Sequence, residues 1–182
     1  MTIAIVLNPI QHHKNAGVLG GESVSEEKSS PQFQATVQLQ SALMGLTLAY
    51  KQKYGDEALE VAKAFIKQLG IRLGNQLKEK TGVVGSGPKD IERVLHAWQD
   101  PATLGPPAKS TVEGKRLTMT REAPTQCPAM LVAKQMNLPL GMVCNTVAFP
   151  MFRGVAEAIN PKARHTSVQI DSKKCIDVIE VP

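Results

Sequence analysis

The sequence predicts an α+β domain in which N-terminal helices pack on an antiparallel sheet. Helical periodicity fills the first half of the chain, and the second half carries strands, the last two joined by a short link. With 182 residues, 42% of them hydrophobic, the chain can form one domain with a buried core. We therefore expect a flexible arm over residues 1–33 and a single α+β domain over residues 34–182.

The expected arm combines a short apolar run with a long polar stretch. Residues 2–8 could form a strand, which Pro9 would end. The following residues are rich in Gly, Ser, Glu and Lys and contain few large apolar side chains. Such a segment cannot bury enough apolar surface to order itself.

Three helices are expected after Pro31. Gly55 separates the first from the second, and Gly87 with Pro88 introduces the third. Gly70 and Gly74 lie one turn apart in the second helix, which favours close helix packing over a ligand against bare backbone. The expected apolar stripes are Val37, Leu39, Leu43, Met44, Leu46 and Tyr50 in the first helix, and Leu59, Ala62, Phe65, Ile66, Leu69, Leu73 and Leu77 in the second.

The second half predicts a cysteine-bearing C-terminal helix–hairpin segment. Alternation over residues 111–123 predicts one half-buried strand before it. Pro128 begins a short helix that Asn137 and Pro139 should end. A longer helix is expected over residues 140–158, and Pro150 should kink it or end its first part. The strand "ARHTSVQID", the link "SKK" and the strand "CIDVIEV" then form the hairpin.

Charge and cysteine usage narrow the function classes. The net charge is +5, but lysines and arginines are scattered among acids without a nucleic-acid motif, so we expect no nucleic-acid partner. The N-terminal apolar run is too short for a membrane span and has no basic flank, so we expect no membrane association. Three cysteines without a CxxC pair favour reduced thiols in the cytoplasm.

The cysteines and one histidine are the candidate chemical groups. Cys127 precedes Pro128 and would occupy a helix N-cap, where free amides and the helix dipole favour a thiolate; filling space at a corner is an equally good interpretation. Cys144 lies on an apolar side, which favours a buried structural thiol. Arg164 and His165 should face opposite sides of a strand, so His165 either faces inward near a cysteine or lies on the surface.

The order of these residues resembles a known family. Cys127-Pro128, Cys144, Asn160-Pro161 and Cys175 follow one another as in the L-2-amino-thiazoline-4-carboxylic acid hydrolase family, over roughly residues 117–181. The resemblance implies hydrolysis of a cyclic amidine ring. The layout also resembles the 4-vinyl reductase domain, which implies a small-molecule-binding module, in some proteins with zinc.

Three hypotheses follow. The first is a cofactor-free hydrolase that opens a small heterocyclic amidine or amide, with Cys127 as nucleophile and His165 as general acid or base. The second is a binding or sensor domain in which the three cysteines hold a metal such as zinc, and the third gives the cysteines only a structural role.

Few aromatic residues and a Met-rich helix are compatible with a homo-oligomer. For the hydrolase, the candidate catalytic residues are Cys127, Cys144 and His165, and the candidate substrate-binding residues are Asn145, Arg153, Arg164 and Cys175.

Overall fold

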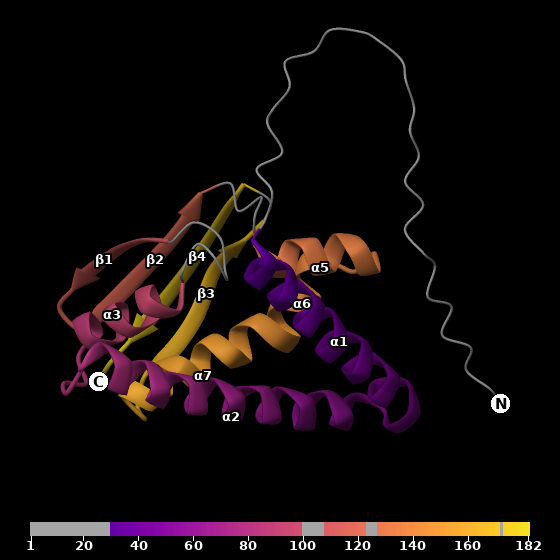
Figure 1. Cartoon of the computed structure of the whole chain (residues 1–182), viewed down its shortest axis with the longest axis horizontal. Helices are drawn as coiled ribbons and strands as arrows, with labels where there is room; N and C mark the ends of the chain where they lie inside the picture. The colour runs from indigo at the N-terminus through magenta and orange to yellow at the C-terminus, as the bar shows by residue number, and fades with distance from the viewer. Residues whose placement is uncertain (1–29, 100–107, 123–126, 172) are drawn as a thin grey trace, which may run out of the picture.

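The computed structural model describes residues 30–99, 108–122, 127–171 and 173–182 and shows the expected α+β fold (Figure 1). The strand expected near the N-terminus lies outside the described residues. The helices are α1 (Pro31–Tyr54), α2 (Asp56–Thr81), α3 (Pro88–Trp98), α5 (Pro128–Met136), α6 (Leu140–Val143), the π-helical turn η1 (Cys144–Ala148) and α7 (Phe149–Ile159). The strands are β1 (Lys109–Glu113), β2 (Arg116–Glu122), β3 (Arg164–Ile170) and β4 (Lys174–Glu180).

Helix α1 begins three residues earlier than the boundary expected for the domain. Ser30 is its N-cap, and the Ser30 Oγ accepts a hydrogen bond of 3.0 Å from the Phe33 amide. Pro31 takes a first-turn position, where its missing N–H costs nothing. Residues 31–33 therefore belong to the helix and not to the arm.

The apolar stripes of α1 and α2 are only partly buried. Val37, Met44 and Ile66 are buried as expected, whereas Leu46, Tyr50 and Phe65 are more than half exposed. The turn between α1 and α2 lies at the end of the molecule far from the sheet (Figure 1). Side chains near this turn therefore have few other elements to pack against. Part of the apolar stripe of each helix is therefore exposed to solvent.

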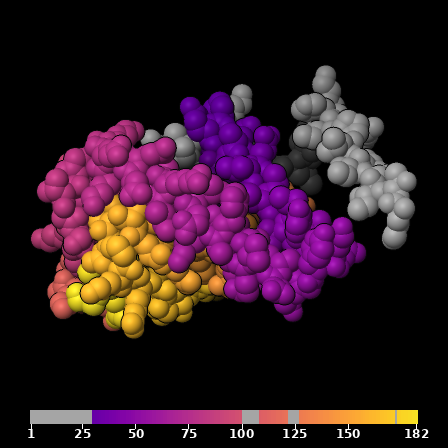
Figure 2. Space-filling model, turned by 90° about the horizontal axis from the view of Figure 1, so that it is seen from below, coloured from indigo at the N-terminus to yellow at the C-terminus, as the bar shows by residue number. Residues whose placement is uncertain are grey.

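Close packing explains the paired glycines of α2. A Cβ at Gly70 would overlap the Met151 carbonyl of α7, and a Cβ at Gly74 would lie 2.9 Å from the Val155 carbonyl oxygen. Figure 2 shows the magenta surface of α2 and α3 against the orange surface of α7. The preference for helix packing over ligand contact is confirmed at these two positions.

The four strands form one antiparallel sheet in the order β1-β2-β4-β3. The expectation of a single strand over residues 111–123 was wrong, because β1 and β2 form a hairpin. Gly114 has a φ of 56° at the turn, a conformation that glycine adopts without strain. Leu117, Met119 and Ile179 lie on the sheet face that packs on α3 and α7, and each is at most 2% exposed.

Pro150 divides the helix expected over residues 140–158. Proline has no N–H to donate to the carbonyl four residues back, and the preceding Phe149 amide instead donates to the Cys144 carbonyl, five residues back. The segment therefore runs as α6, η1 and α7. Its π-helical turn begins at Cys144.

Candidate functional site

A row of polar side chains lies on the helix-covered face of the sheet. The register between β2 and β4 sets Arg121 opposite Cys175 and Met119 opposite Asp177, while His165 of β3 lies opposite Ile179. Alternate residues of a strand share one face. Arg121, Cys175, Asp177 and His165 therefore face the helices together with the buried Leu117, Met119 and Ile179.

Asp177 is the centre of this row. Its Oδ1 lies 2.9 Å from His165 Nε2, and its Oδ2 accepts a hydrogen bond of 3.5 Å from the Cys175 thiol. The His165 side chain is 1% exposed and contacts the rings of Phe149 and Phe152, and its Nδ1 is buried without a partner. We assign the tautomer in which Nε2–H donates to Asp177, because it leaves no buried N–H of the ring unpaired.

A cavity of about 470 Å³ lies beside the polar row. Its polar end includes Arg121, Asp177 and all three cysteines. Residues of α1, α2, α3, α5, η1 and α7 complete its mainly apolar wall, among them Leu43, Leu73, Leu77, Trp98, Phe149 and Phe152. The cavity has the size and the lining of a small-molecule site.

Two of the three cysteines are held as neutral thiols. Burial raises the pKa of Cys144 to about 12, and the nearby Cys127 and Asp177 add to this rise. Burial also raises the pKa of Cys175, and Asp177 raises it further, whereas Arg121 acts in the opposite direction. Neither group is a resting thiolate at neutral pH.

Cys127 occupies the helix N-cap that the sequence predicts. Its carbonyl accepts hydrogen bonds from the amides of Met130 and Leu131, and Pro128 holds the first position of α5. The Cys127 thiol makes no capping hydrogen bond, is only half-buried and lies at the cavity. Cys127 is therefore a partly exposed residue of the cavity wall.

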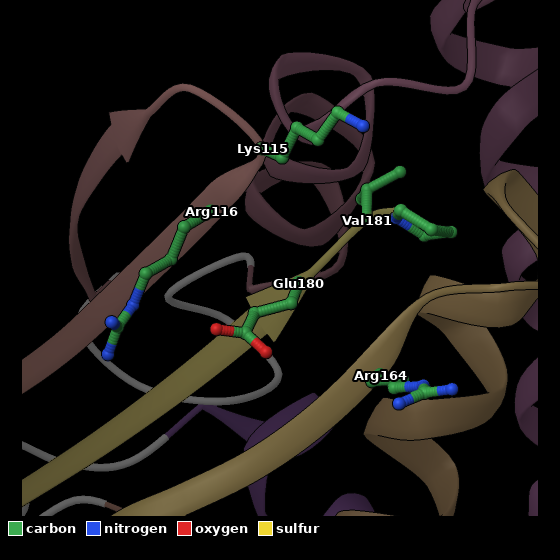
Figure 3. Close-up of a pocket in the computed structure, with 6 residues that line it drawn as sticks. Lys115, Arg116, Arg164, Glu180 and Val181 are labelled. Atoms are coloured by element: carbon green, nitrogen blue, oxygen red, sulfur yellow. The ribbon is translucent and has the colours of Figure 1, made fainter.

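Three predicted site residues lie away from this cavity. Asn145 and Arg153 are exposed, and neither is among the residues that line it. Arg164 is exposed and borders a different hollow of about 400 Å³, at the opposite end of the β3–β4 hairpin from Cys175 (Figure 3). There Glu180 lies between Arg116 and Arg164 across the sheet, as the strand register requires.

Sequence reasoning missed Arg121 and Asp177. Asp177 carried a usable signal, since it lies two residues after Cys175 in an apolar strand and so shares its face. Arg121 carried none, because only the pairing of β2 with β4 brings it opposite Cys175.

Two further properties concern metals and membranes. Within the described ranges, no three His, Cys, Asp or Glu side chains are grouped so as to hold a metal ion, which leaves the zinc hypothesis without support there. All three cysteines are free thiols. None of the helices that the structure describes has the length and apolar character needed to span a bilayer.

Comparison of the chain with protein-family models, with curated proteins and with solved structures found no match. The resemblance carried by Cys127-Pro128, Cys144, Asn160-Pro161 and Cys175 therefore stays a prediction. Function has to be inferred from the cavity and from the groups that line it.

Proposed function

We propose that this chain is a hydrolase that binds a small heterocyclic amidine or amide in the cavity and opens it with a cysteine. The observation that supports this function is the meeting of three thiols and Asp177, which is bonded to His165 behind it, at one mainly apolar cavity. An apolar cavity with a few polar groups at one end orients a small ligand and excludes water from the reacting bond.

Cys127 is the proposed nucleophile. Cys144 and Cys175 resist ionisation, because burial and Asp177 favour their neutral forms. Cys127 lies at the start of a nine-residue helix, whose first amides and dipole favour negative charge nearby. The same helix end can stabilise the charge that develops on the substrate during attack.

The reaction proceeds in two steps. The Cys127 sulfur forms a bond to the C=N or carbonyl carbon, the ring C–N bond breaks, and the leaving nitrogen takes up a proton. Water then attacks the sulfur-bound carbon and releases the free thiol. One water molecule is added across the C–N bond in total.

Asp177 is the proposed proton carrier, and His165 is a positioning residue. Asp177 lines the cavity, whereas His165 holds Asp177 Oδ1 and is packed between two phenylalanine rings. In this proposal Asp177 takes the role in proton transfer that the sequence suggested for His165. Asn145, Arg153 and Arg164 have no part in it, because they lie away from the cavity.

A binding module without catalysis is the second candidate. The neutral thiols of Cys144 and Cys175 and the apolar walls suit retention of a ligand as well as its conversion. In that case the cavity would bind the same class of molecule and leave it unchanged.

Turnover of a panel of cyclic amidines and lactams separates the two candidates. We expect the wild-type chain to open at least one of them, and we expect Cys127→Ala to lower kcat by roughly 1,000-fold or more with little change in KM. Asn145→Ala, at an exposed residue that does not line the cavity, is the matched control and should keep the activity. Binding without turnover would favour the binding module, and full activity of Cys127→Ala would exclude the covalent mechanism.

A further inference from the structure

Arg121 places a positive charge at the cavity, and none of the described residues pairs with this charge. Its Nε is buried and has no hydrogen-bond partner, and no ion pair joins its guanidinium to a carboxylate in the described part of the chain. Asp177 is the cavity carboxylate nearest in the strand register, but its two oxygens are engaged by His165 and Cys175.

A cation without a partner is unfavourable beside apolar walls, unless a bound ligand supplies the opposite charge. Removing a charged group from water costs free energy that a partner charge and hydrogen bonds must offset. The planar guanidinium presents parallel N–H donors that match the two oxygens of a carboxylate. Gln40 also lines the cavity and also has a buried side-chain oxygen without a partner.

The rest of the cavity sets the shape of the ligand. Leu73, Leu77, Trp98 and Phe152 supply apolar wall to the same cavity. A volume of about 470 Å³ equals that of roughly 15 water molecules at about 30 Å³ each. A single five-membered ring would leave much of this space unfilled.

We propose that the cavity binds a monocarboxylate with an apolar body, its carboxylate paired with Arg121 and its body against the wall that contains Trp98. This inference names the class of ligand that the proposed hydrolase would bind. It rests on the proposed function only because it places the ligand in the same cavity. The ligand thus presents an anion at one end and an apolar chain or ring system at the other.

Trp98 makes the proposal directly measurable, because it is the single tryptophan of the chain and lines the cavity. The probes are octanoate, octan-1-ol and octylammonium, which share an apolar chain and differ in the charge of the end group. Their Kd values are measured from Trp98 emission and by equilibrium dialysis on the full chain. We expect octanoate to bind at least tenfold more tightly than octan-1-ol, and octylammonium to bind most weakly.

Variants of Arg121 test the role of the cation. Arg121→Met should abolish the preference for octanoate over octan-1-ol, and Arg121→Lys should keep part of it. Octanoate should raise the Tm of the wild-type chain but not that of Arg121→Met, because only a ligand that binds the folded state stabilises it. Arg93→Met, which removes an exposed arginine of α3, is the matched control and should bind all three probes as the wild type does.

Three outcomes would overturn the proposal. They are equal affinities for octanoate and octan-1-ol, an unchanged preference in Arg121→Met, and no binding of any probe. A lower Tm of ligand-free Arg121→Met would show that the chain itself pairs this cation, and would also overturn it. The probes contain no amide or amidine bond for a hydrolase to open, so these results do not depend on whether the chain is a hydrolase.

Discussion

Burial is the main cause of the raised pKa of Cys175 and of Cys144, and the Asp177 carboxylate raises the pKa of both thiols further. Asp177→Asn removes this negative charge and should lower both pKa values, more for Cys175, which also donates its hydrogen bond to the carboxylate. Alkylation by iodoacetamide, followed for each cysteine by mass spectrometry across a pH series, reports the change. The rate profile of Cys175 should move to lower pH.

The matched control for this change is Asp56→Asn, which removes an exposed carboxylate from the first residue of α2. Its alkylation profiles should coincide with those of the wild type. A Cys175 profile that stays in place or moves to higher pH in Asp177→Asn would show that the carboxylate does not govern this thiol.

At the scale of elements, the crossing of α2 with α7 depends on glycine. A Cβ at Gly70 meets the Met151 carbonyl, a backbone atom that cannot turn aside as a side chain can. Gly70→Ala should therefore lower the free energy of unfolding by about 2–3 kcal/mol, as overpacking does elsewhere. Urea unfolding curves measure this change.

Gly45→Ala provides the control within a helix. A Cβ at Gly45 in α1 would make only an ordinary contact, 3.8 Å from Met136 Cε. This change should raise the free energy of unfolding by about 0.5–1 kcal/mol, because alanine is the better helix former. If both variants shifted stability in the same direction, close packing at Gly70 would not be the cause.

Most helices and the C-terminal hairpin could be predicted because their signals are local. Ser30-Pro31, Gly55, Gly87-Pro88 and Cys127-Pro128 mark helix ends, and each mark is readable within a few residues. The hairpin of β1 and β2 was missed because only the two residues of its turn interrupt the alternation. The π-helical turn was missed because a change of hydrogen-bond register leaves no mark in apolar periodicity.

At the scale of the whole molecule, the cavity lies where two apolar cores meet. Leu77, Met119 and Phe152 belong to the core between the sheet, α2, α3 and α7, whereas Val147 and Phe149 belong to the core around α1, α5 and η1. The cysteines could be selected from the sequence, since they are rare and lie near turns. Their meeting with Arg121 and Asp177 could not, because it depends on strand pairing and helix packing between segments far apart in the chain.

The raised pKa of Cys144 makes the stability of the whole molecule sensitive to alkaline pH. The thiol ordinarily loses its proton near pH 9.0, but in the folded chain its pKa is about 12. Between these values the unfolded chain releases a proton that the folded chain retains. For this group, the free energy of unfolding is therefore unaffected below pH 9 and falls above it by about 1.4 kcal/mol per pH unit.

Urea unfolding at pH 7.5, 9.0 and 10.5, under reducing conditions, measures the slope. Cys144→Ala should show a shallower fall between pH 9.0 and 10.5, because it removes this group and also the part of the raised pKa of Cys175 that Cys144 causes. Equal slopes would show that Cys144 is not held as a neutral thiol by the fold.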